Sequence, residues 1–450
     1  MPTINDDYDE IVLTHPKEMK EAIAYLTKEM DRRNCKFGKE VLPTFLKPVF
    51  MSQEERSAIC EITGHIMSIL DKVTRLYFTR PELREYFYIE GEAKAIIDVE
   101  HGYGRNVMIS RPDAFLVNDS LRFVEFNCDS PAGCGLCDTT EAIFKETFLF
   151  EKLSERYVFN SKRRTDYLLD ALLEAYHEFG GKKERPNIAI VDWEGIRTTN
   201  EFQIIQAFFK QKGFETTIAD PRNLKLVNGR LESDGFPIDL IYRRVIFKEL
   251  MEKLDEVTDF IKADQKGKVC VVNPLRSRLA SNKAMLAIMT NQKEFRDFFS
   301  EEENQIIKRH IPWTRRVLDM KTHYEGNPVF LKKHIVSHKD HLVLKPGDSY
   351  GGKDVAIGRE TDEATWKNLV ARILRNNEDW VVQRYVEITQ MTVPIMDGET
   401  VHMANKKYNL NPFVFAHRYA GSVARLSDRS VINVSAGGGL VPVVDYDTIS

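Results

Sequence analysis

Two groups of residues, one toward each end of the chain, have the chemistry to bind a metal ion and a nucleotide. Toward the start, Asp113 is followed by Glu125 and Asn127, whose oxygen atoms are hard ligands that suit Mg²⁺. Toward the end, Lys345 is followed by the glycine pair Gly351-Gly352, which lets backbone N–H groups approach phosphates closely. Because Mg²⁺ is usually held by one or two carboxylates together with substrate phosphates, these residues predict a Mg-ATP site assembled from both halves of the chain.

The pattern around the acidic group predicts a β-hairpin. Strand-like runs lie on both sides of Asn118-Asp119, which favours a turn. The second run, 121–126, alternates apolar and polar residues as a half-buried strand does. Glu125 and Asn127 are two residues apart and therefore share one face of their strand. The hairpin is expected to bring Asp113 close to both of them.

The glycine-rich segment 347–354 comes close to the P-loop pattern G-x-x-x-x-G-K-[ST] but differs from it in two ways. Asp354 replaces the hydroxyl residue that would hold Mg²⁺. The residues that follow, 355–359, look like a strand, whereas a P-loop opens a helix. We therefore predict a flap that joins two strands and covers a nucleotide. A true P-loop and a simple tight turn are the alternatives.

Length and composition indicate an ordinary soluble protein of two or three domains. The chain has 450 residues, of which 42% are apolar and 29% charged. Its formal net charge of −4 gives no electrostatic reason to expect nucleic acid as a partner. No apolar run approaches the length of a membrane span, and the acidic start 5–10 does not resemble a signal peptide. We expect a cytoplasmic protein with neither a nucleic-acid nor a membrane partner.

The six cysteines do not form the pattern of a disulfide framework. Cys128, Cys134 and Cys137 lie close together in the sequence, and the last two form a C-x-x-C motif. A metal or redox role needs a fourth ligand or a thioredoxin-like context, and the sequence offers neither. Small buried thiols beside a turn are the favoured interpretation, and a chemical role for these cysteines stays open.

The remaining patterns predict a helical start followed by mixed α/β structure. Residues 52–55 fit a capping box before a helix with apolar residues at helical spacing. Residues 188–219 fit a strand, a helix and a second strand, which implies a parallel sheet, but no G-x-G-x-x-G supports a dinucleotide site. Further expected elements are a helix over 164–184, strands at 240–244, 269–272, 340–345 and 380–386, and a helix over 363–375.

Five segments in a fixed order make the chain resemble the circularly permuted ATP-grasp ligases, a group that includes the synthetase domain of glutathionylspermidine synthase. The metal segment precedes the lysine segments here, whereas in ordinary ATP-grasp enzymes it follows them, and this order is the mark of the permutation. The likeness runs over most of residues 106–443, and the five segments are 111–131, 273–286 with Lys283, 345–352, 382–386 and 422–425.

This resemblance implies an α/β fold of mixed α+β type: a circularly permuted ATP-grasp fold with a βαβ domain like the one that precedes the ATP-grasp in ordinary members, and a helical N-terminal region. The division that follows is a helical region at 1–105, a permuted segment with the metal-binding strands at 106–163, the βαβ domain at 164–275 and the nucleotide-binding lobes at 276–450.

The resemblance also implies an ATP-dependent carboxylate–amine ligase, which forms an amide through an acyl phosphate and releases ADP and phosphate. ATP and Mg²⁺ are the implied cofactors. The partners are a small-molecule acid and amine, such as an amino acid or peptide; many such enzymes pair, so a homodimer fits. The implied residues are Asp113, Glu125 and Asn127 for metal, Arg111, Ser130 and Arg425 for catalysis, and Lys283, Lys345, Gly351, Gly352, Gln383 and Tyr385 for nucleotide.

Each assignment has an alternative. Asp113 and Glu125 could pair with neighbouring arginines on a strand surface, Lys283 could be a solvated helix residue, and Arg425 could belong to a structural ion pair. The stretch 435–439 could line an acyl-phosphate pocket or be only a loop. A kinase or other phosphotransferase on the same fold, and a non-catalytic nucleotide-binding partner protein, are the competing functions. The substrate-binding residues of the polyamine enzyme have no clear counterparts here, and no amidase domain precedes the ligase part.

Overall fold

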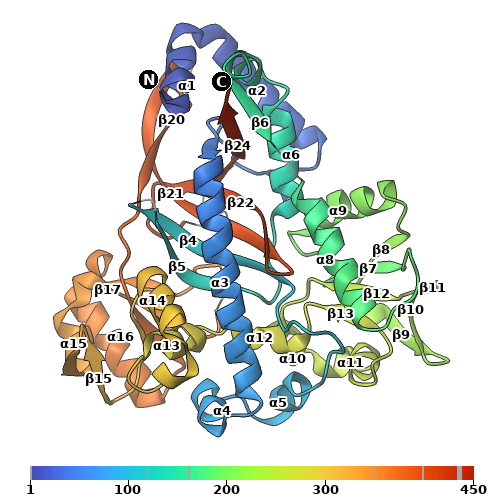
Figure 1. The fold of residues 1–450 in the computed structure, drawn as a ribbon, viewed down its shortest axis with the longest axis vertical. Coiled ribbons are helices and arrows are strands. Elements are labelled where there is room, and N and C mark those ends of the chain that lie inside the picture. Colours follow the sequence, from blue (N-terminus) through green and yellow to red (C-terminus); the bar gives the residue numbers. More distant parts are fainter. Residues whose placement is uncertain are drawn as a thin grey trace.

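The centre of the fold is an antiparallel sheet built from strands of both ends of the chain (Figure 1). The computed structural model describes residues 3–118, 120–160, 163–349, 351–397, 400–432 and 438–449. The strand order is β23-β22-β21-β4-β5, and β20 pairs with the outer part of β21. The strands are β4 (Ile109–Val117), β5 (Ser120–Asn127), β20 (Gln390–Asp397), β21 (Thr400–Phe415), β22 (Arg418–Ser427) and β23 (Gly439–Val441).

The predicted hairpin is present, with one irregularity. β4 and β5 are antiparallel, and Asp113 pairs directly with Glu125. The next pair is Ala114 with Phe123, so Val124 is an extra residue on β5. Such a β-bulge leaves the extra residue out of the ladder and bends the strand. The bulge therefore leaves the Val124 carbonyl available to a partner outside the hairpin, directly beside the predicted metal ligands.

Helices cover both faces of this sheet. The long helix α3 (Gln53–Tyr77) packs against β21 and β22 in front of the sheet in Figure 1. It begins where the sequence predicts, because Ser52 and Glu55 form the expected capping box. Side chains of β21 alternate between two cores, with Leu410 packing on the side of α3 and Phe413 on the other side. The helices of that second core include α1 (Ile4–Thr14), α2 (Pro16–Arg32), α6 (Cys134–Phe144), α7 (Phe148–Leu153), α8 (Arg164–Glu178) and α9 (Thr199–Gln211).

The predicted strand–helix–strand unit is confirmed as part of a parallel sheet of order β13-β12-β7-β8, at the right of Figure 1. Its strands are β7 (Ile188–Val191), β8 (Thr216–Ala219), β12 (Leu240–Arg243) and β13 (Cys270–Val272), and α9 (Thr199–Gln211) connects the first two. The lobe also contains β9 (Leu224–Val227), β10 (Arg230–Ser233), β11 (Phe236–Pro237), α10 (Phe247–Glu252) and α11 (Thr258–Gln265).

Besides the central sheet with its helices and the lobe of the parallel sheet, the fold has a third lobe, at the lower left of Figure 1. It is built on an antiparallel sheet of order β14-β19-β17-β18. Its own core is centred on the buried Trp366. The predicted strand over 355–359 is wrong beyond its first half, because β18 spans only Ala356–Ile357 and a 3-10 turn follows. Gly358 lies so close to the Lys339 carbonyl that a side chain there would collide with it. The elements of residues 278–384 other than β18 and the 3-10 turns are α12 (Arg278–Ser281), α13 (Ala284–Thr290), α14 (Glu301–His310), β14 (Thr314–Arg316), β15 (Lys321–Tyr324), β16 (Asn327–Phe330), α15 (Leu331–Ser337), β17 (Leu342–Pro346), α16 (Glu363–Asn376) and β19 (Trp380–Arg384).

The first hundred residues contribute strands as well as helices. β3 (Val49–Ser52) pairs in parallel with β24 (Val443–Thr448), and β24 also pairs with β6 (Tyr157–Asn160). This small sheet joins the start of the chain to its end, at the top of Figure 1. The remaining elements of this region are β1 (Lys36–Phe37), β2 (Glu40–Val41), α4 (Pro81–Phe87) and α5 (Gly91–Ile97). No helix among the described residues is long and apolar enough to cross a membrane.

The side chain of Asn273 ties the parallel sheet to the predicted metal-binding strands. It follows β13 and is almost fully buried. Its oxygen accepts hydrogen bonds from the backbone N–H groups of Met108 and Ile109, at 2.9 and 2.8 Å. Its amide nitrogen donates to the carbonyls of Ile109 and Cys128, at 2.6 and 2.8 Å. One side chain thus satisfies four backbone groups where the first strand of the β4–β5 hairpin begins and where the second strand ends.

We predict that Asn273→Ala destabilises the protein by at least about 3 kcal/mol, because each buried polar group left without a partner costs about 1–3 kcal/mol. The free energy of unfolding in urea measures this loss. Asn376→Ala, at the exposed end of α16, is the control and should change it by less than about 0.5 kcal/mol. Equal effects of the two substitutions would contradict the role assigned to Asn273.

Candidate nucleotide and metal site

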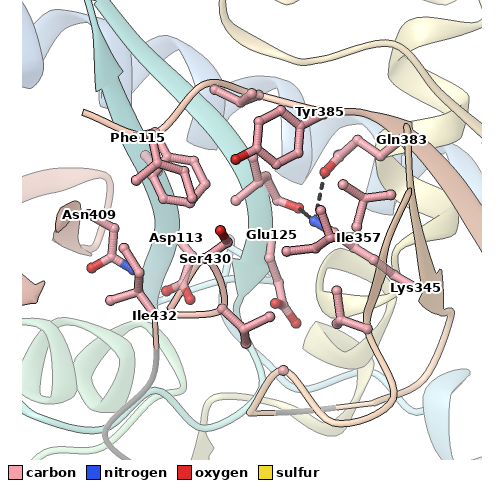
Figure 2. Close-up of a pocket in the computed structure, with 18 of the residues that line it drawn as sticks. Asp113, Phe115, Glu125, Lys345, Ile357, Gln383, Tyr385, Asn409, Ser430 and Ile432 are labelled. Carbon is pink, nitrogen blue, oxygen red and sulfur yellow. Dashed lines mark hydrogen bonds between the residues drawn. The ribbon is translucent and has the colours of Figure 1, made fainter. Parts of the chain in front are cut away.

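A cavity between the central sheet and the third lobe contains most of the predicted site (Figure 2). The empty space in it, including the part that is open to solvent, is about 940 Å³. Ten of the twelve residues predicted for the site line it, and Ser130 and Lys283 do not. The ten are Arg111, Asp113, Glu125, Asn127, Lys345, Gly351, Gly352, Gln383, Tyr385 and Arg425.

The three predicted metal ligands lie side by side because the hairpin register places them there. Asp113 on β4 is paired with Glu125 on β5. The Asn127 amide nitrogen donates to an Asp113 carboxylate oxygen at 3.0 Å. The donor set is two carboxylates and one amide, all hard ligands, and no group of three or more His, Cys, Asp or Glu side chains placed to hold a metal ion occurs among the described residues. These residues fit Mg²⁺ that is completed by substrate phosphates and water, but not a metal site that is complete without substrate.

Two arginines lie against Asp113. The Arg425 Nη2 atom, on β22, is 2.9 Å from Asp113 Oδ2, and Arg111 Nη2 is 3.6 Å from Asp113 Oδ1. Burial alone would raise the pKa of Asp113, but the two guanidinium groups outweigh it and hold that pKa below its usual value. Asp113 and Arg425 therefore do form an ion pair, as the alternative interpretation of these residues suggested. The pair lines the cavity, however, and does not lie on an open strand surface.

Lys283 is connected to the site through Glu125, although it does not line the cavity. It is the N-terminal cap residue of α13, and its side chain is only 3% exposed. Its ammonium group lies 2.9 Å from Glu125 Oε1 and donates to the Ser349 carbonyl at 2.8 Å. The alternative of a solvated helix residue is wrong. Lys283 instead connects a predicted metal ligand to the glycine-rich flap.

Lys345 projects from β17 into the cavity and is held by two oxygen atoms (Figure 2). Its ammonium group donates to the Gln383 side-chain oxygen at 2.7 Å and to the carbonyl of Val124, the bulge residue, at 3.1 Å. The Gln383 amide nitrogen donates in turn to the Thr314 hydroxyl at 3.1 Å. Burial lowers the pKa of Lys345 to about 8, an effect that Glu125 opposes. Both ends of the Gln383 amide are therefore engaged, the oxygen by Lys345 and the nitrogen by Thr314, although the resemblance assigns Gln383 to the nucleotide.

The glycine-rich flap joins β17 to β18, two antiparallel strands, so it is not a P-loop. Gly351 and Gly352 have φ near +70°, a conformation that favours glycine. A side chain at Gly352 would also collide with Val431, which is another residue of the cavity lining. The base of the flap is anchored by an ion pair of 2.5 Å between Arg278 and Asp348.

Apolar side chains also line the cavity, as a flat heterocyclic base requires. Tyr385 is among the lining residues, and the Arg359 guanidinium lies over its ring, 3.9 Å from the ring centre. The apolar side chains of the lining are Phe115, Val343, Val355, Ile357, Val386, Ile388 and Ile432. Of the stretch 435–439, residues 435–437 lie outside the described part of the chain.

Ser130 lies in a neighbouring turn rather than in the cavity wall. Its hydroxyl donates to the Arg244 carbonyl at the end of β12. The turn is held by Glu201, which accepts from the N–H groups of Gly133 and Gly135 at 2.7 and 3.3 Å. Sequence reasoning did not find Glu201 or Arg244, because contacts across more than 60 residues leave no local pattern. The nearby Cys128, Cys134 and Cys137 are buried, and burial raises the pKa of each thiol, which disfavours the reactive thiolate.

The family of this chain follows from its match to a known family model. The family model described as circularly permuted ATP-grasp type 2 matches residues 115–427. The chain belongs to this family. The match confirms the fold expected from the order of the metal and lysine segments, and it supports an ATP-dependent ligase in general terms.

Two individual proteins are similar to this permuted ATP-grasp chain. A protein of Frankia casuarinae named "Putative glutamate--cysteine ligase 2-2" is 25% identical over 213 residues, which are 45% of this chain and 22% of that protein. This chain thus spans about a fifth of that relative's length. A solved structure of a glutathione synthetase like-effector from Globodera pallida, in its apo form, has a TM-score of 0.62 at 12% identity and covers 94% of this chain and 96% of its own. At that identity the likeness shows a shared fold.

We predict that affinity for a non-hydrolysable ATP analogue, with Mg²⁺ present, falls as pH rises through about 8. Phosphate oxygens favour the charged form of Lys345, whose pKa is about 8 without ligand, so binding takes up a proton above that pH. The decline should reach at most about tenfold per pH unit, as one linked proton allows. Titration calorimetry measures it.

Lys345→Arg is the matched variant, because a guanidinium group stays charged over this range. Its affinity should depend on pH much less than that of the wild type. The same slope in both proteins would show that another group is responsible.

Proposed function

We propose that this protein is an ATP-dependent carboxylate–amine ligase that joins its substrates through an acyl phosphate. The observation that supports this most strongly is the convergence of Asp113, Glu125 and Asn127 with Arg425 and the lysine and flap segments of the opposite end of the chain around one cavity. Hard oxygen ligands beside buried cations are what a magnesium–polyphosphate complex needs. Family membership supports the use of ATP.

In this proposal ATP supplies the phosphoryl group, and Asp113, Glu125 and Asn127 would hold Mg²⁺, which would neutralise phosphate charge. The substrate carboxylate attacks the terminal phosphorus and ADP leaves. The amine then attacks the acyl carbon, phosphate leaves with its bonding electrons, and the nitrogen loses a proton. Arg111 and Arg425 stabilise the charge on the transferring group, because the guanidinium fork matches phosphate oxygens. Lys283 and Lys345 orient the phosphates of the nucleotide.

An amino acid or short peptide is the class of acid that we propose. The family resemblance suggests it, and one relative is named for a ligase that joins glutamate and cysteine. The remaining roles stay as the sequence assigned them: Gly351 and Gly352 cover the phosphates and Tyr385 borders the base. Ser130 contacts the substrate carboxylate only after its hydroxyl leaves the Arg244 carbonyl.

The test is release of ADP and phosphate from Mg-ATP against a panel of amino acids, short peptides and polyamines, with mass detection of products. We expect phosphate release that requires both an acid and an amine. Glu125→Ala should lower kcat by at least about 100-fold, the loss typical for one preorganised electrostatic group in an active site. Glu155→Ala, an exposed carboxylate on another lobe, should leave the rate unchanged.

Two outcomes would contradict the proposal. A stable phosphorylated product that accumulates over many turnovers without any amine, and that added amine does not convert to an amide, would favour a kinase. Nucleotide binding without turnover across the panel would favour a non-catalytic partner protein.

A further inference from the structure

The two predicted metal carboxylates are already neutralised by the cations that are expected to bind phosphate. Arg425 and Arg111 contact Asp113, and Lys283 contacts Glu125. These groups have little access to water, since Lys283 is 3%, Arg425 7% and both carboxylates about 20% exposed. Each carboxylate thus serves as the counterion of a buried phosphate-binding cation while no ligand is bound.

This pairing penalises either ligand when it binds alone. A divalent cation that takes the carboxylates leaves Arg425 and Lys283 buried without a counterion, which is strongly unfavourable. A metal-free triphosphate that takes the cations brings its negative charge beside Asp113 and Glu125, at distances where like charges repel strongly. When metal and triphosphate bind together, the two carboxylates bind the metal in place of the cationic side chains. The cationic side chains then bind phosphate oxygens in place of the carboxylates. All charges then stay paired.

We propose that Asp113 and Glu125 are selectivity residues that exclude metal-free polyphosphates, in addition to holding the metal. This inference rests on the proposed nucleotide site. It goes further, because a residue that only coordinates metal would have no effect on the binding of metal-free nucleotide. Asn127 provides the contrast within the same site: it offers a ligand oxygen but no charge, and its amide nitrogen donates to the Arg111 backbone carbonyl and to Asp113.

The experiment compares affinity for a non-hydrolysable ATP analogue in excess Mg²⁺ and in EDTA, by titration calorimetry. The proteins are wild type, Asp113→Asn, Glu125→Gln and Asn127→Leu, each first shown to be folded by its thermal unfolding. The wild type should bind the magnesium form much more tightly than the metal-free form. Asp113→Asn and Glu125→Gln should each bind the metal-free analogue at least about tenfold more tightly than the wild type, because a like charge within about 4 Å has been removed.

Asn127→Leu should lose affinity for the magnesium form without gaining any for the metal-free form. Inorganic tripolyphosphate in EDTA should follow the same order across the four proteins, since the effect depends on charge and not on the base. Unchanged or weaker metal-free binding by both carboxylate variants, with normal binding of the magnesium form by the wild type, would overturn this inference and leave the proposed function intact. A wild type that binds the analogue under neither condition would overturn both.

Discussion

The pairing of β4 with β21 is the interaction on which the site depends. Ile109 and Ser110 pair with Phe415 and Val414, about 300 residues later in the chain. β21 in turn holds β22, so Arg425 and Asp113 come from strands on opposite sides of one central strand. Contacts this distant in sequence carry a large loop-closure entropy, which burial on both faces of the sheet offsets. The permuted order of segments is therefore tolerated because the sheet, and not the chain order, positions the ligands.

Charge balance follows from that geometry. The site holds four cationic side chains, Arg111, Lys283, Lys345 and Arg425, and two carboxylates in a region of low exposure. Isolated charges in such a place are costly, so each group has an oxygen or a nitrogen partner. For Lys345 the partners are neutral oxygen atoms, and its pKa falls to about 8. The excess of positive charge suits a polyphosphate, and the internal pairs offset part of the cost of burying these charges until one binds.

Much of the fold could be predicted from the sequence, because it depends on local patterns. The capping box at Ser52, the hairpin that pairs Asp113 with Glu125 and the parallel strands around α9 all follow from residues less than about 30 positions apart. The features that the sequence could not reveal are contacts between distant segments. The hydrogen bond from Lys345 to the carbonyl of the bulge residue Val124 is one, because it forms only when the third lobe packs against the hairpin. The engagement of Gln383 with Lys345 and Thr314 is another.

The most direct test of the central claim is a crystal structure with a non-hydrolysable ATP analogue and Mn²⁺, whose anomalous scattering locates the metal. We expect metal between Asp113, Glu125, Asn127 and the phosphates, with Arg425 and Lys283 turned from the carboxylates to phosphate oxygens. Metal bound away from these three side chains, or a nucleotide outside the cavity between the central sheet and the third lobe, would contradict it.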